Sequence, residues 1–149
     1  MKLNLIVSTE TQDRCALSEQ ELLHIAEYVL EREHIRCTTE LSVQLVGISR
    51  MQELNCDWRG IDAPTDVLSL ECERPGDEST GIPTLLGDII LCPSYIARQA
   101  AQYEASEQRE TALLLIHGLL HLLGYDHETD DEARLMETLE ERYLAEIAS

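Results

Sequence analysis

Basic residues are scarce in this chain of 149 residues. It has 11 Lys and Arg against 29 Asp and Glu, a formal net charge of −18 at pH 7, and Lys2 is its single lysine. The arginines are spread along the sequence without a cluster. Because nucleic acids are bound by neutralising their phosphates with Lys and Arg, this composition excludes a protein that coats nucleic acid over a broad surface. Any contact with RNA must be confined to a small local patch, and we expect no binding to DNA.

The sequence also has no apolar run long enough to cross a membrane. Its longest apolar region, 112–123, is interrupted by His117, Gly118 and His121 and falls short of the ~20 residues that a transmembrane helix needs. The apolar stretch Leu3–Val7 is too short for the core of a signal peptide, and no cleavage pattern follows it. We therefore expect a cytoplasmic protein without membrane contact.

Paired cysteines are missing as well. The five cysteines form no CxxC pair and are odd in number, which argues against a disulfide framework and against a thiolate zinc site. This pattern fits a reducing compartment, where such side chains usually act as small buried apolar groups. The cysteines are Cys15, Cys37, Cys56, Cys72 and Cys92.

The apolar residues that are present recur with the periods of strands and helices. A hydrophobic content of 44% over 149 residues suits one continuous core, so we expect a single domain over 1–149. Capping-box patterns at 18–21 and 129–132 mark two helix starts, and Pro93 can begin a third helix. The periodicity predicts strands at about 2–7, 41–45, 65–70 and 85–91, and helices at about 18–34, 48–55, from 93 onward, 107–123, and from 129 onward.

These elements predict an α/β (α+β-like) fold, a mixed four-stranded sheet packed by about five helices, with 107–123 as a central buried helix. The stretch 72–83 is rich in Pro, Gly and charge and is expected to be an exposed, mobile loop. The helix that begins at 93 and the helix that begins at 129 are each expected to have an inward-facing stripe. The stripes are Ile96, Ala100 and Tyr103 on the first, and Leu135, Met136, Leu139, Tyr143 and Ile147 on the second.

Three of the five histidines stand at the spacing of a metal site. Residues 117–127 read HGLLHLLGYDH, and His117 and His121, four positions apart on a helix, project from one face about 6 Å apart along its axis. Gly124 lies where a left-handed residue would end the helix and let the chain carry His127 back. Three imidazoles with a fourth position open to water are typical of catalytic zinc, which lowers the pKa of its bound water to about 7.

The neighbours of these histidines narrow the chemistry. Zinc proteases with this spacing carry Glu directly after the first histidine as general base, and here that position is Gly118. Peptide hydrolysis by that mechanism is therefore disfavoured. Asp126 could support the turn, orient a ligand or take part directly. His24 and His34 have no partner at ligand spacing and are expected to be structural or solvated.

The sequence resembles the YbeY family of bacterial endoribonucleases and ribosomal-RNA maturation factors. The resemblance covers most of the chain, and several motifs agree in order as well as in sequence. After Ser69, where the family has Phe-Pro, this chain has Leu70-Glu71, which puts substrate preference in question rather than metal binding. The motifs are HGLLHLLGYDH at 117–127, Leu54-Asn55, Trp58-Arg59-Gly60, Pro64–Ser69 and Leu86–Ile89.

The resemblance implies a mixed α/β fold, one zinc ion per chain held by His117, His121 and His127, and cleavage of single-stranded RNA. It links that activity to 16S rRNA 3′-end maturation and ribosome quality control, with single-stranded rRNA, the small ribosomal subunit and its proteins as partners. It also implies that Arg59 lines the active-site cleft, where a guanidinium group suits a phosphate. Thr65, Asp66 and Asp88 also lie in family motifs, and we interpret them as side chains that tie loops to the backbone.

Two points stay open from the sequence. Three imidazoles also suit Ni²⁺, Cu²⁺ and Fe²⁺. A ribosome-biogenesis binding factor with feeble nuclease activity is the main alternative function, favoured by the acidic charge, and a metalloprotease is a weaker one.

Overall fold

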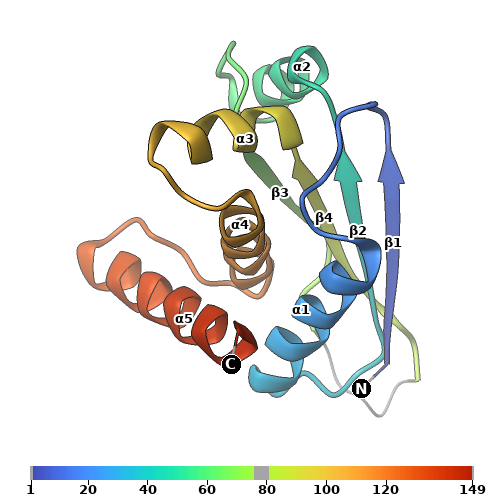
Figure 1. The fold of residues 1–149 in the computed structure, drawn as a ribbon. Helices are drawn as coiled ribbons and strands as arrows, with labels where there is room; N and C mark the ends of the chain where they lie inside the picture. The colour runs from blue at the N-terminus through green and yellow to red at the C-terminus, as the bar shows by residue number, and fades with distance from the viewer. Residues whose placement is uncertain (1, 76–80, 149) are drawn as a thin grey trace.

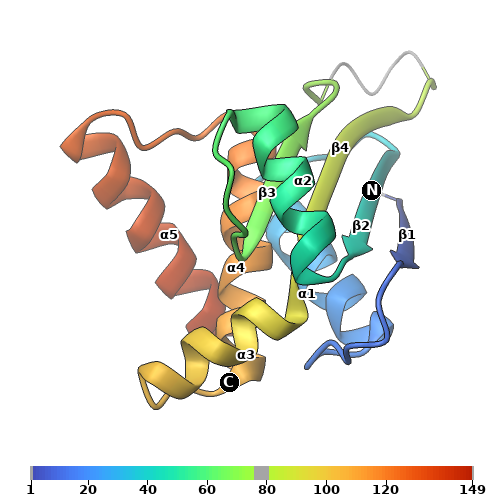
Figure 2. The same cartoon turned by 90° about the horizontal axis from the view of Figure 1, so that it is seen from above.

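The computed structural model describes residues 2–75 and 81–148, and in them a four-stranded sheet is packed by five helices (Figures 1 and 2). The mixed α/β fold expected from the sequence is confirmed. The elements are β1 Leu3–Thr9, α1 Glu19–Arg32, β2 Thr39–Leu45, α2 Ile48–Arg59, β3 Val67–Glu71, β4 Thr84–Leu91, α3 Pro93–Gln102, α4 Glu107–Leu122 and α5 Asp130–Ala148.

The sheet combines parallel and antiparallel pairs in the order β1-β2-β4-β3. β1, β2 and β4 are parallel, and β3 pairs antiparallel with β4, which confirms the expected crossover and hairpin. On the edge strand β1, alternate residues pack on the core while Ile6 is 60% exposed, as a half-buried strand requires. Part of the expected mobile loop, 76–80, lies outside the described residues.

Helix α4 is the centre of the molecule. It contacts α1, α3, α5, β3 and β4, and half of its residues are buried (Figure 1). Gly118 makes the close approach to the sheet possible, because a Cβ at this position would meet Ser69 Oγ at 2.9 Å and Ile89 Cδ1 at 3.2 Å. The central buried helix expected over 107–123 is confirmed.

Helix α2 packs on the opposite face of the sheet. Ile90 and Leu68, neighbours across the β3–β4 pair, belong to a small apolar cluster with Met51 and Leu54, whereas Ile89 belongs to the main core on the α4 side. The helix extends to Arg59, four residues beyond its expected end. Its last residues are exposed and carry no apolar period, so the sequence pattern did not register them.

Two residues that were expected to face inward are exposed in the structure. Tyr103 is 78% exposed because α3 ends at Gln102, and Leu135 is 52% exposed because the buried stripe of α5 runs through Met136.

The cysteines differ in their burial. Cys37 and Cys92 are buried, Cys15 is half-buried, and Cys56 and Cys72 are exposed, so the expectation of buried thiols was wrong for the last two. All five are free.

Over residues 2–75 and 81–148, no helix has the length and apolar content that a membrane span requires.

Candidate functional site

A hollow of about 270 Å³ lies at the start of β3, beside the end of α2 and at the sheet edge where β4 ends. The carboxyl ends of parallel strands are the usual place for ligands in α/β folds. The middle of α4 and one residue of α5 close the opposite side. The hollow is lined by Arg59, Thr65, Asp66, Val67, Leu113, Leu114, His117 and Glu140.

Arg59 is placed in this hollow by the end of α2. Gly60 adopts φ +71° and donates its N–H to the Cys56 carbonyl, which ends the helix directly after Arg59. The Arg59 side chain is exposed, and among the described residues it forms no ion pair or hydrogen bond. Its guanidinium donors are therefore free for an anionic ligand.

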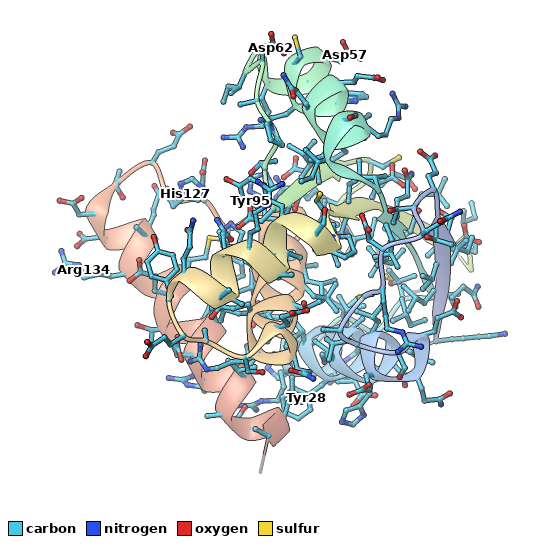
Figure 3. All side chains as sticks on the ribbon, turned by 45° about the horizontal axis from the view of Figure 1, so that its top comes forward. Tyr28, Asp57, Asp62, Tyr95, His127 and Arg134 are labelled. Atoms are coloured by element: carbon cyan, nitrogen blue, oxygen red, sulfur yellow. The ribbon has the colours of Figure 1, made fainter. Side chains whose placement is uncertain are left out.

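The turn after α4 has the geometry that the sequence predicts. Gly124, with φ +109°, donates to the His121 carbonyl, and Tyr125 donates to the Leu120 carbonyl, a Schellman motif that ends the helix. The chain then returns and places the His127 and His117 rings with their centroids 5.9 Å apart and an angle of 25° between their planes, which is a nearly stacked arrangement. Figure 3 shows His127 in the segment between α4 and α5. His121 follows His117 by one helical turn on α4.

Glu140 is a site residue that the sequence analysis missed. It lies on α5, is only 8% exposed, and its Oε1 is 2.5 Å from His117 Nδ1. This hydrogen bond raises the pKa of His117; burial opposes the rise, and the nearby carboxylates of Glu140 and Asp66 add to it. A signal existed in the sequence, because Glu140 follows Met136 by four positions and precedes Tyr143 by three, which places it on the buried stripe of α5.

Short acidic side chains stabilise the loops around the hollow. Asp66 Oδ1 accepts hydrogen bonds from the Val67 N–H at 2.8 Å and the Thr65 hydroxyl at 3.2 Å, so the tie to the backbone is confirmed for Asp66, whereas Thr65 bonds a side chain. Asp126 Oδ1 accepts from the His127 N–H at 2.8 Å, which is turn support. Asp88 lies within β4 and forms no side-chain hydrogen bond in the part of the chain that is described, so no tie of this kind is seen for it.

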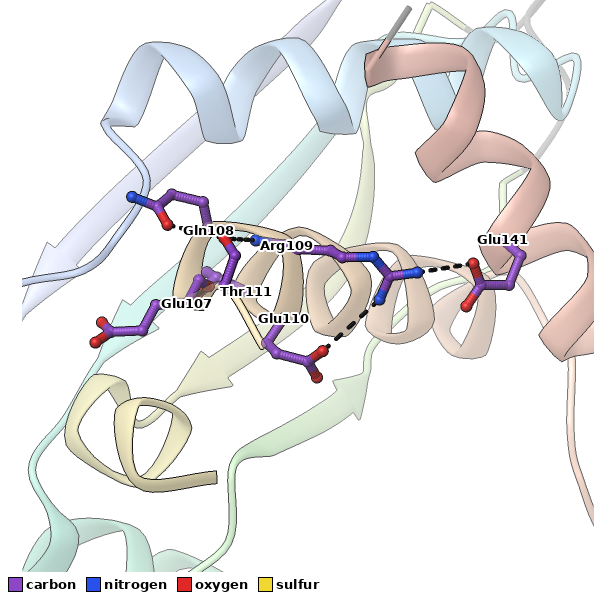
Figure 4. A network of polar contacts seen from close by, with 7 residues as sticks. Glu107, Gln108, Arg109, Glu110, Thr111 and Glu141 are labelled. Atoms are coloured by element: carbon purple, nitrogen blue, oxygen red, sulfur yellow. Dashed lines mark hydrogen bonds and ion pairs between the residues drawn. The ribbon is translucent and has the colours of Figure 1, made fainter. Parts of the chain in front are cut away.

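Polar contacts hold α5, which carries Glu140, against α4 and α1. Arg109, in the first turn of α4, pairs with Glu141 at 3.0 Å and with Glu110 at 3.7 Å (Figure 4). At the other end of α4, Glu33 accepts hydrogen bonds from the hydroxyls of Tyr125 and Tyr143. The helix and the turn that bear site residues are thus anchored from both sides.

The three predicted histidines are of the residue type that divalent transition metals bind. Three imidazoles are suitable ligands, and His117 is already held by a buried carboxylate, as histidine ligands of metals usually are. The hollow brings Asp66 and Glu140 together with Arg59 as its one permanent cation, an environment that a bound cation would balance. The structure brings His117 close to His127, but no three His, Cys, Asp or Glu among the described residues are placed to hold an ion. The three-histidine ligand set stays a prediction.

A larger hollow elsewhere in the described residues does not contain this chemistry. It measures about 970 Å³, lies between α1, the start of α4 and the end of α5, and is lined by eight apolar and eight polar or charged residues. Of the predicted site residues it contains none. His24 lies on its wall and His34 is exposed, so neither joins the other three histidines.

Known proteins resemble this chain over most of its length. The family model "Endoribonuclease YbeY" matches residues 7–148. The chain is 42% identical over 131 residues to an Endoribonuclease YbeY of Micrococcus luteus, covering 87% of this chain and 83% of the relative. It is 39% identical over 147 residues to an Endoribonuclease YbeY of Legionella pneumophila (strain Corby), covering 99% and 91%.

A solved structure shares the fold. The solution structure of TM1509 from Thermotoga maritima superposes with a TM-score of 0.63 at 27% identity, covering 97% of this chain and 89% of the other. Family match, relatives and fold lead to one conclusion. The chain belongs to the Endoribonuclease YbeY family.

Proposed function

We propose that this protein is a metal-dependent endoribonuclease that cleaves single-stranded RNA, and that it acts on the small ribosomal subunit in 16S rRNA 3′-end maturation and ribosome quality control in the cytoplasm. The observation that carries the proposal is the hollow lined by both His117 and Arg59, an arginine that has no ion pair or hydrogen bond among the described residues. The relatives of this chain bear the name endoribonuclease, which supports the reaction class.

Arg59 is the residue suited to bind the phosphate. Its planar, permanently charged group can donate two parallel hydrogen bonds to phosphate oxygens, and among the described residues no carboxylate forms an ion pair with it. His117, His121 and His127 would hold one zinc ion, with nickel or another divalent transition metal as alternatives. When bound, such an ion stabilises charge on a phosphoryl oxygen and provides a nucleophile at neutral pH.

The position of Gly118 argues against a metalloprotease. The general base of zinc proteases would stand here, yet this site faces Ser69 and Ile89 inside the packed interface between α4 and the sheet. A Glu side chain there would have to displace core atoms and could not reach a substrate in the hollow. The acid-base chemistry of those enzymes therefore has no counterpart at this position.

Cleavage of a labelled single-stranded RNA tests the proposal. We expect activity in the metal-loaded wild type, none after chelation or in His117→Ala, and a loss of at least about tenfold in Arg59→Glu. Arg36→Glu is the matched control, because it changes the net charge by the same amount. Arg36 is exposed in the loop before β2, whereas Arg59 lies beyond the opposite end of β2. Equal cleavage of RNA by the Arg59 and Arg36 variants would show that Arg59 has no specific role in cleavage.

A binding factor for ribosome biogenesis is the second candidate. The net charge of −18 favours it, because such a surface repels free RNA. The same assay separates the two functions when small ribosomal subunits replace naked RNA as substrate. Binding to subunits without any metal-dependent cleavage would favour the binding factor.

A further inference from the structure

We propose that Glu140 is a positioning residue for the metal site, and that it fixes the His117 ring with Nε2 as the ligating nitrogen. The inference rests on the proposed metal-binding function. Its basis is the 2.5 Å contact between Glu140 Oε1 and His117 Nδ1, between two helices and 23 positions apart in sequence.

In the proposed arrangement, the proton of the contact lies on the ring. A carboxylate accepts hydrogen bonds and donates none, so with Glu140 as the carboxylate partner the His117 Nδ1–H is the donor. In the neutral imidazole the remaining lone pair is then on Nε2. A carboxylate behind a histidine ligand fixes the tautomer and ring orientation and raises the basicity of the ligating nitrogen.

Packing alone does not account for Glu140. The residues around it on the buried stripe of α5 are apolar or aromatic, and they already hold the helix against α4. Burying a carboxylate is costly unless it is paired, and replacing a buried ion pair by apolar groups is often neutral or stabilising. Among the described residues His117 is the partner found for Glu140. Its place in the wall of the hollow suits a role at the metal better than a role in folding. The apolar and aromatic residues of the stripe are Met136, Leu139, Tyr143 and Leu144.

Zinc affinity of purified full-length variants, measured by competition with a chromogenic chelator, tests the role. We expect Glu140→Ala to weaken zinc binding roughly 10- to 100-fold, as losses of such carboxylates typically do. Glu140→Gln should lose less, because an amide oxygen still accepts from Nδ1–H but has no charge. Glu137→Gln is the matched control, an exposed glutamate on the same helix, and should bind zinc like the wild type.

Two further measurements distinguish positioning from a loss of structure. The absorption bands of the Co²⁺-loaded protein should change in Glu140→Ala at full loading, because the His117 ligand is less basic and less fixed. Thermal unfolding of the metal-free variants reports the fold separately. Wild-type affinity and an unchanged Co²⁺ spectrum in Glu140→Ala would overturn the positioning role while leaving the metal site intact. An affinity loss that only follows a lower melting temperature, with an unchanged spectrum, would overturn it too. A wild type that binds neither zinc nor Co²⁺ would instead overturn the metal-dependent function, and the inference with it.

Discussion

Replacing Gly118 by alanine should destabilise the protein, although it places a better helix former within α4. Helix propensity alone predicts a gain of about 1 kcal/mol from Gly to Ala. The packing predicts the opposite, because the new Cβ would meet Ser69 Oγ at 2.9 Å and Ile89 Cδ1 and Cγ1 at 3.2 and 3.3 Å. Ser69 can rotate away, but Ile89 is completely buried and cannot.

Overpacking a core by one methyl group typically costs about 1–3 kcal/mol, which exceeds the propensity gain through most of its range. We expect a net destabilisation of about 1 kcal/mol, or a melting temperature lower by roughly 2–4 °C for a domain of this size. His117 and His121 lie on the same helix, so a shift of α4 should also weaken metal binding. Urea and thermal unfolding by circular dichroism measure the first effect.

A second substitution makes the reasoning refutable. Ile89→Val removes the Cδ1 atom that the new methyl group would meet, so the double variant should lose less than the sum of the two single variants, by at least about 0.5 kcal/mol. An alanine variant more stable than the wild type would show that α4 does not rest on the sheet as closely as described. Strict additivity would show that Ile89 is not the obstacle.

Other perturbations address the metal, the substrate and the helix anchors. His121→Ala should lose most of about one metal per chain by elemental analysis, and full occupancy would contradict the three-histidine site. Because Arg59 is the one arginine among the described residues that line the hollow, the log–log salt slope of RNA affinity should be roughly −1 to −2 at ~0.7 per phosphate contact. Binding can be followed by the fluorescence of Trp58, the single tryptophan, which is 62% exposed and next to Arg59 in the sequence. A slope steeper than about −4 would contradict a focal site. Burial and the hydrogen bond to Glu33 raise the pKa of Tyr143 above its usual value near 10, so this stabilising contribution is complete below pH 10 and is lost as the pH rises further. Glu33→Ala should shift tyrosinate formation and alkaline unfolding to lower pH, and an unchanged ultraviolet titration would show that the contact has no such effect.

The sequence was sufficient for features that depend on neighbouring residues. The helix that carries His117 and His121 follows from a continuous apolar segment, and the reversal after it follows from Gly124, because only a residue tolerant of positive φ ends a helix in this way. The strands β1 and β2 also follow from alternation along single segments. These features repeat over a few residues, so one segment contains the whole signal.

Tertiary structure decided the contacts between distant segments. Arg59 and His117 share a hollow only because α2 ends at the carboxyl edge of the sheet that α4 crosses, and no local pattern records this. The spacing along α5 places Glu140 on the buried stripe, but only the packing of α5 shows that His117 is its partner. Gly118 could be interpreted from sequence only as a missing general base, whereas its contacts with the sheet give its structural reason. Periodicity fixes the buried stripe of a helix only to within about one residue, and neighbouring residues such as exposed Leu135 and buried Met136 differ by that amount. Which side chains each stripe contacts is decided by the tertiary fold.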